Sequence, residues 1–217
     1  MARRKPISTL RGRRSFQRRA GQKAPRSVTL IVCEGETEQE YFEAARIRFE
    51  LSTAEVVVAE NNVGPAPISV VQCAEKKCRE RGGYDKVYCV MDRDGHESFD
   101  RARAAIKALA GRARKPLPIE EAVSIPCFEV WVLLHFGRAD PPFTCCDDVI
   151  KLIRNKHMND YEKADTAVVR QLMHRMDDAV ENAEWLEARA VNNNHNPFTS
   201  VHKVVQHLSG VADQETT

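Results

Sequence analysis

Two short clusters of carboxylates, each placed directly after an apolar run, are the residues of this chain most suited to chemistry. The apolar runs span residues 28–33 and 87–91, and continuous runs of this kind are typical of strands buried on both faces of a parallel sheet. The carboxylates that follow them are Glu34, Glu36, Glu38, Asp92 and Asp94. Because ligands bind at the carboxyl ends of such strands, we expect these side chains to meet at one edge of the sheet.

The crowding of carboxylates at that edge predicts a bound cation. Like charges repel one another and lose hydration when they are buried, and a cation between them offsets both costs. Oxygen ligands favour Mg²⁺ or Mn²⁺ over zinc. Asp92 and Asp94 point the same way from a strand end and can share one ion, and Glu34 can complete the site or act as general acid or base. We therefore expect Glu34, Asp92 and Asp94 to be catalytic and metal-ligating residues, with Glu38 as a further ligand.

Five more residues are candidate accessory groups: Gly35, Glu36, His96, Glu129 and Lys163. Gly35 allows substrate to approach the backbone closely or provides a φ value closed to other residues, and Glu36 could help to hold a second ion. His96 could orient a water molecule, Glu129 could reach the metal from a helix start, and Lys163 could contact phosphate. Simpler explanations compete with these roles, because Asp-x-Asp is also a turn signal and acids at helix starts complement the helix dipole.

The order of the elements indicates a parallel α/β sheet flanked by helices. Strands are expected at 28–33, 55–59, 86–91 and 120–125, and helices between them at 37–50, 68–81 and 99–110. This alternation builds β-α-β units with right-handed crossovers. From Pro126 onward the periodicity is helical, with segments near 146–156, 164–189 and 198–209 and with Thr199 as a helix N-cap. We expect an α/β domain at 28–125, a helical extension at 126–210 packed on the same fold, and a tail at 211–217.

Charge divides the chain into a basic arm and an acidic body. Residues 1–27 contain ten Lys or Arg and no acid, which leaves 23 basic against 31 acidic residues in the rest of the chain. We expect the arm to be disordered until it meets a polyanion, because it has little apolar surface to bury. Its expected nucleic-acid contacts are Arg11, Arg13, Arg14, Arg18 and Arg19, and the alternative is a solubilising tail.

Targeting signals and cysteines are also informative. No apolar run reaches the length of a membrane span and the start does not have the pattern of a secretory signal, so a cytoplasmic protein without membrane partners is expected.

The seven cysteines include no CxxC pair and are expected to be reduced core residues. A zinc site on Cys145 and Cys146 is disfavoured, because adjacent cysteines lack the usual ligand spacing.

A strand ending in Glu-Gly and a later strand ending in Asp-x-Asp form the pattern of the Toprim domain of topoisomerases, primases and overcoming-lysogenization-defect nucleases. The matching residues are Glu34, Gly35, Asp92 and Asp94. Over residues 28–209 the chain resembles, more narrowly, the RloB-like family of restriction-linked abortive-infection proteins. Five ordered blocks carry this resemblance: IVCEGETEQEYF at 31–42, MDRDGH at 91–96, SIPCFEVWVLLHF at 124–136, YEK at 161–163 and NPFTSVHKVV at 196–205. One departure is Gly95-His96 after the Asp pair.

The resemblance implies a Toprim-like fold and a Mg²⁺- or Mn²⁺-dependent nuclease that hydrolyses phosphodiester bonds in DNA or RNA. It also implies an antiphage abortive-infection system in which a partner ATPase of the ABC or AAA type is encoded beside the nuclease and controls it. The chain has no GxxxxGK[ST] sequence, so ATP hydrolysis would come from that partner. The alternative is a non-catalytic module that binds nucleic acid or a partner. A phosphohydrolase of the haloacid-dehalogenase type is disfavoured, because its Asp-x-Asp follows the first strand rather than the third.

Overall fold

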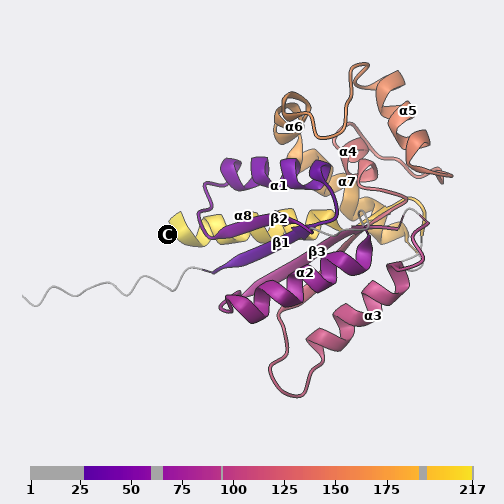
Figure 1. Ribbon diagram of the computed structural model, residues 1–217. Coiled ribbons are helices and arrows are strands. Elements are labelled where there is room, and N and C mark those ends of the chain that lie inside the picture. Colours follow the sequence, from indigo (N-terminus) through magenta and orange to yellow (C-terminus); the bar gives the residue numbers. More distant parts are fainter. Residues whose placement is uncertain (1–26, 60–65, 94, 191–194, 217) are drawn as a thin grey trace, which may run out of the picture.

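Five strands form one sheet in the part of the chain that this computed structural model describes, residues 27–59, 66–93, 95–190 and 195–216. The strand order is β2-β1-β3-β4-β5, and Figure 1 labels the first three of these strands. The parallel strands are β1 (Thr29–Cys33), β2 (Ala54–Val58), β3 (Lys86–Asp92) and β4 (Ile119–Ile125), and the short β5 (Phe198–Thr199) pairs antiparallel with β4. The α/β fold class expected from the sequence is confirmed.

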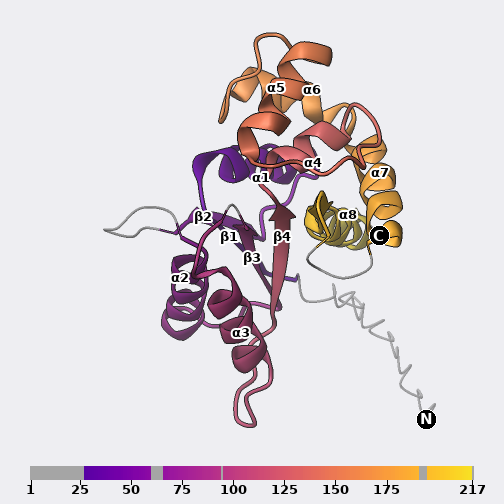
Figure 2. The ribbon, with the colours of Figure 1, turned by 90° about the vertical axis from the view of Figure 1, so that its right-hand side faces the viewer.

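Helices cover both faces of this sheet (Figure 2). The first three connect the parallel strands: α1 (Glu36–Arg48), α2 (Pro67–Glu80) and α3 (Phe99–Ala110). The others follow β4: α4 (Glu129–Leu134), α5 (Cys146–Lys156), α6 (Thr166–Met173), α7 (Met176–Arg189) and α8 (Val201–Thr216). α2 and α3 pack on one face, whereas α1 and α8 pack on the other, where α4 to α7 extend the same layer.

The apolar core lies on both faces of the sheet, which explains why its strands read as continuous apolar runs. In β1, Leu30 and Val32 belong to the core cluster under α2 and α3, while Ile31 and Cys33 belong to the cluster that includes α1 and the C-terminal helices. All five residues of β1 are buried. With both faces covered, the carboxyl ends of the strands remain as the place for polar groups.

The C-terminal region differs from the sequence expectation in two places. The segment expected to be helical over 164–189 is divided into two helices. The first, α6, ends at Met173, and the second, α7, begins at Met176. The expected helix at 198–209 begins instead with β5, and α8 starts at Val201. Thr199 therefore lies in a strand, although its Oγ1 still accepts a hydrogen bond from the N–H of Val201 at 3.3 Å.

A disulfide joins Cys127 and Cys146, so the expectation of seven reduced cysteines is wrong for this pair. Sequence reasoning missed the pair because the two residues are 19 positions apart and meet only when α5 folds against the start of α4. The five cysteines that form no disulfide are Cys33, Cys73, Cys78, Cys89 and Cys145. A disulfide therefore ties together the start of the helical region.

Two of the predicted features lie outside the described residues. These are Asp94 and the basic arm with Arg11, Arg13, Arg14, Arg18 and Arg19. Among the residues that are described, no helix combines the length and apolarity that a membrane span requires.

Candidate active site

The ends of three neighbouring parallel strands bring acidic side chains to one edge of the sheet. Glu34 directly follows β1, Asp92 is the last residue of β3, and Glu129 begins α4 shortly after β4. Glu38 joins them from the first turn of α1. The charges of Glu34, Glu38 and Glu129 all act on Asp92, so the four carboxylates form one electrostatic cluster.

Burial makes this acidic cluster unusual. Glu34, Glu38 and Glu129 are only 8, 5 and 1 % exposed. Charged side chains are rarely buried to this extent unless they are paired or bind a metal. The cluster therefore needs a specific compensation for the lost hydration of its charges.

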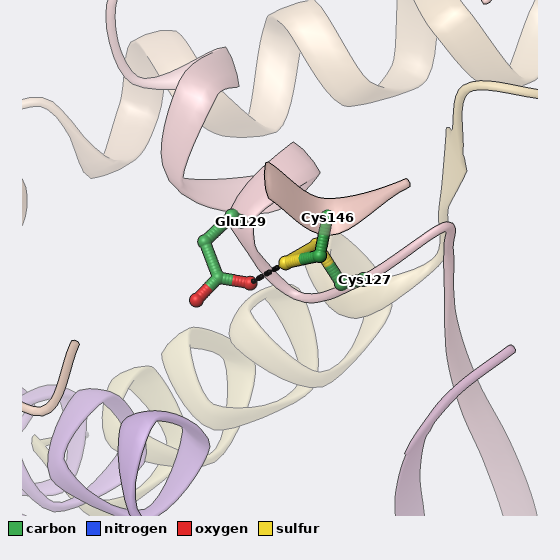
Figure 3. Close-up of side chains that lie close together, drawn as sticks. All are labelled: Cys127, Glu129 and Cys146. Atoms are coloured by element: carbon green, nitrogen blue, oxygen red, sulfur yellow. Dashed lines mark hydrogen bonds between the residues drawn. A yellow bond between two sulfur atoms is a disulfide. The ribbon is translucent and has the colours of Figure 1, made fainter. Parts of the chain in front are cut away.

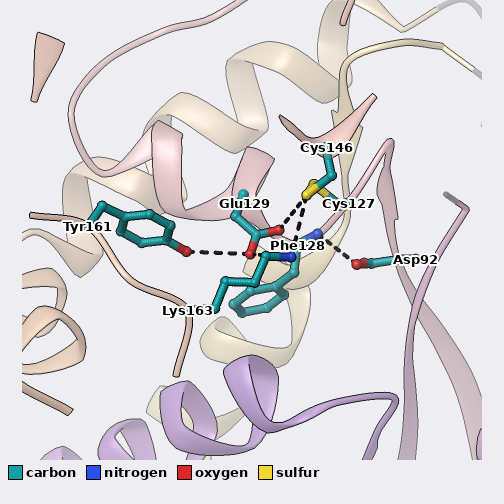
Figure 4. The surroundings of a disulfide bond; sticks show 7 residues. All are labelled: Asp92, Cys127, Phe128, Glu129, Cys146, Tyr161 and Lys163. Carbon is teal, nitrogen blue, oxygen red and sulfur yellow. Dashed lines mark hydrogen bonds and ion pairs between the residues drawn. A yellow bond between two sulfur atoms is a disulfide. The ribbon is translucent and has the colours of Figure 1, made fainter. Parts of the chain in front are cut away.

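Two hydrogen bonds from backbone N–H groups connect Asp92 to its neighbours. Its own N–H donates a hydrogen bond to Oε2 of Glu34 at 3.2 Å, which joins the ends of β1 and β3. The N–H of Phe128 donates to Oδ2 of Asp92 at 3.0 Å (Figure 4). The other oxygen, Oδ1, is buried and accepts no hydrogen bond from the described residues. A buried carboxylate oxygen without a donor is well suited to bind a cation.

The titration of the cluster shows how unfavourable its charges are. Burial raises the pKa of Glu38 to about 7, and repulsion from Glu129 and Glu34 adds to this effect. Burial also raises the pKa of Asp92 well above its usual value, with further repulsion from Glu38 and Glu129. In both carboxyl groups burial therefore favours the protonated form, and a cation would favour the charged form.

Lys163 supplies a positive charge beside this cluster. Its Nζ lies 3.0 Å from Oε1 of Glu129, the same oxygen that accepts a hydrogen bond from the hydroxyl of Tyr161 at 3.5 Å. Partial burial opposes the charged lysine, but attraction to Glu129 outweighs it and raises the pKa of Lys163. The side chain of Lys163 is half-exposed, so this residue can pair with Glu129 and still be reached by an anion from solvent.

The remaining accessory candidates differ in their positions. Gly35 has an extended φ of −142° that any residue can adopt, so a special φ is not its role; a Cβ at this position would lie 3.1 Å from Oε2 of Glu38. Glu36 is exposed, two residues before the buried Glu38, and residues at this spacing do not share a helix face. His96 is exposed, with Nε2 at 3.8 Å from Oε1 of Glu34.

A second set of ligand atoms lies next to the carboxylates. Atoms of Cys127, Glu129 and Cys146 all lie within 4.8 Å of one another (Figure 3). A disulfide sulfur is not a thiolate ligand, so the oxidised pair cannot hold a metal as two thiolates. Glu34, Glu38 and Asp92 offer carboxylate oxygens, the type of ligand that hard cations such as Mg²⁺ or Mn²⁺ prefer.

Sequence reasoning missed three groups at this site. The backbone N–H of Phe128 and the disulfide leave no pattern in the sequence, because both depend on how α4 and α5 fold back on the sheet. Tyr161 lies two residues before Lys163, in one of the sequence blocks that carry the family resemblance. This position was the one feature of the sequence that could have indicated Tyr161.

Comparison with known proteins identifies the family. A family model described as RloB-like protein matches residues 29–208. No curated protein and no solved structure matches the chain. The matched range spans all five strands of the sheet and all four carboxylates of the site. The chain therefore belongs to the RloB-like protein family.

Proposed function

We propose that this protein is a Mg²⁺- or Mn²⁺-dependent nuclease that hydrolyses phosphodiester bonds in DNA or RNA. The observation that carries the proposal is the buried Oδ1 of Asp92, which has no hydrogen-bond donor among the described residues and lies in a cluster with three more buried acids. Oxygen-rich acidic sites at the carboxyl ends of parallel strands are suited to hard cations. The Toprim-like pattern of Glu34, Gly35 and Asp92 supports the same assignment.

Asp92, Glu34 and Glu38 would hold the cation with Glu129 beside them, together with Asp94 from outside the described residues. A bound divalent ion supplies Lewis-acid polarisation of a phosphoryl oxygen and lowers the pKa of a water molecule. Asp92 is fixed in place by the N–H of Phe128. Because Gly35 has no Cβ, it leaves room for the carboxylate of Glu38.

Lys163 and the basic arm would bring phosphate to this acidic site. The ammonium of the half-exposed Lys163 side chain lies beside the buried Glu129 and can stabilise negative charge that develops on phosphoryl oxygens. The body of the protein is acidic and repels a polyanion, so the ten basic residues of the arm would raise the local concentration of nucleic acid.

The proposed biological setting is antiphage defence by abortive infection. Membership of the RloB-like family supports this setting. A nuclease of this kind would be toxic when free, and we propose that a partner ATPase of the ABC or AAA type holds it inactive until infection. The protein would then act in the cytoplasm.

The test combines cation binding with hydrolysis by the full-length protein. Calorimetry with Mn²⁺ should show binding to the wild type and none to Asp92→Asn, with the exposed Glu36→Gln as matched control. The protein without its partner should cleave labelled duplex DNA or structured RNA with Mn²⁺ and not with EDTA, and the partner ATPase should suppress this cleavage. No Mn²⁺ binding would overturn the proposal, and binding without hydrolysis of either polymer would favour the non-catalytic module.

A further inference from the structure

The Cys127–Cys146 disulfide is placed where it can affect the acidic site. Cys127 comes directly before Phe128, whose N–H orients Asp92, and two residues before Glu129. Cys146 is the first residue of α5, and both sulfurs are buried. The bond closes a loop of 19 residues and restricts the backbone at Phe128 (Figure 4).

The oxidation state of Cys146 changes the hydrogen bonding of Glu129. Sγ of Cys146 lies 3.0 Å from Oε2 of Glu129, the contact drawn dashed in Figure 3. A disulfide sulfur has no proton, so in the oxidised protein this contact is not a donor to the carboxylate. A reduced thiol at the same place would donate an S–H to Oε2. Meanwhile Lys163 and Tyr161 contact the other oxygen, Oε1.

We propose that the Cys127–Cys146 pair is a redox site that regulates the adjacent carboxylates, which bind a divalent cation more tightly when the disulfide is formed than when it is reduced. This inference rests on the proposed cation site and adds a control to it. Reduction releases the backbone at Phe128 and gives Oε2 of Glu129 a competing donor. Both changes weaken the site.

The redox step is an exchange with a dithiol reductant. The S–S bond between Cys127 and Cys146 breaks, two electrons and two protons pass to the sulfurs, and both become thiols. The reductant is oxidised to its own disulfide, and a disulfide oxidant reverses the reaction. The Cys146 thiol then keeps its proton in the hydrogen bond to Glu129.

Two other uses of the pair fit the surroundings less well. A purely structural disulfide is typical of small secreted domains that lack a core, whereas this chain has large apolar clusters on both faces of its sheet and five further cysteines that form no disulfide. A zinc ion on two thiolates and Glu129 would meet the ammonium of Lys163, which lies 3.0 Å from Glu129 and 3.6 Å from Sγ of Cys146.

The first arm of the test measures the bond itself in the full-length protein. After equilibration in a glutathione buffer of cytosolic redox poise, differential alkylation and mass spectrometry should detect Cys127 and Cys146 as reduced thiols. The two residues should be reduced to the same extent. A bond that stays oxidised in this buffer would be structural and would overturn the inference. Tight retention of added Zn²⁺ by the reduced protein would also overturn it.

The second arm measures Mn²⁺ affinity by calorimetry in the oxidised and reduced states. Reduction should weaken binding roughly fivefold or more, the usual lower range for coupled sites. Cys127→Ala and Cys146→Ala should bind weakly and ignore the redox state, while the control Cys73→Ala should respond as the wild type does. Equal affinity in both states would overturn this inference alone, whereas no Mn²⁺ binding in either state would overturn the proposed cation site as well.

Discussion

The backbone N–H of Phe128 donates a 3.0 Å hydrogen bond to Oδ2 of Asp92 and thereby connects the end of β3 to the start of α4. This contact aims the carboxylate so that its second oxygen is buried without a donor among the described residues. The acidic site therefore depends on the chain that leaves β4 as well as on the strand ends that bear the acids. Changes at the start of α4 should act on Asp92 even where they remove no acid.

Replacing Asp92 with asparagine tests the cation site at constant shape. The substitution removes a charge that its neighbours repel, so the apo protein should be as stable as the wild type or more stable. At a Mn²⁺ concentration of about 100 times Kd, the free energy of unfolding of the wild type should rise by about 2.7 kcal/mol, and that of Asp92→Asn should not change. Thermal unfolding with and without Mn²⁺ measures both effects. A variant stabilised by Mn²⁺ as much as the wild type would place the ion elsewhere.

The pKa of Glu38 predicts the pH dependence of the apo protein. Burial raises this pKa from its ordinary 4.5 to about 7, so the folded state favours the protonated form. The resulting stability is complete below about pH 4.5 and is lost as the pH rises through 7, an effect of about 3 kcal/mol at 1.36 kcal/mol per pKa unit. In EDTA, Glu38→Gln should therefore be more stable than the wild type at pH 8 and similar at pH 5. Urea unfolding at both pH values measures this, and a difference between the proteins that does not change with pH would contradict it.

Lys163 should stabilise the fold through Glu129. Lys163→Met leaves a buried carboxylate with less compensation, and because the lysine is half-exposed we expect a loss of about 1–2 kcal/mol rather than the full cost of a broken buried pair. Adding Glu129→Gln should recover most of that loss. Urea unfolding of the single and double variants measures the coupling. The control is Lys151→Met, at an exposed pair with Asp148, and it should change the free energy of unfolding little. If the effects of Lys163→Met and Glu129→Gln simply add in the double variant, the two residues are not coupled.

The parts of the site that the sequence predicts are those with a local signal. Apolar runs before Glu34 and Asp92 indicate buried parallel strands, and parallel strands must end at a common edge. The hydrogen bond from Phe128 and the Cys127–Cys146 bond have no local signal, because they form when distant segments pack together. β5 was missed for a similar reason: two residues carry no periodicity, and pairing with β4 alone makes them a strand.

Deleting residues 1–26 tests the arm, which lies outside the described residues. The shortened protein keeps the hydrogen bond from the N–H of Val28 to the carboxylate of Asp85, and we expect its free energy of unfolding to change by less than about 0.5 kcal/mol. Binding to duplex DNA should weaken and become less dependent on salt, since each neutralised phosphate contributes a slope of roughly −0.9 in log K against log salt. The arm has ten basic residues and no acid, so even a few contacts would change the slope visibly. Affinities for duplex DNA and structured RNA at several salt concentrations decide the matter. If both proteins show the same slope, the arm is a solubilising tail, and the acidic body must attract nucleic acid through its own lysines or through a partner.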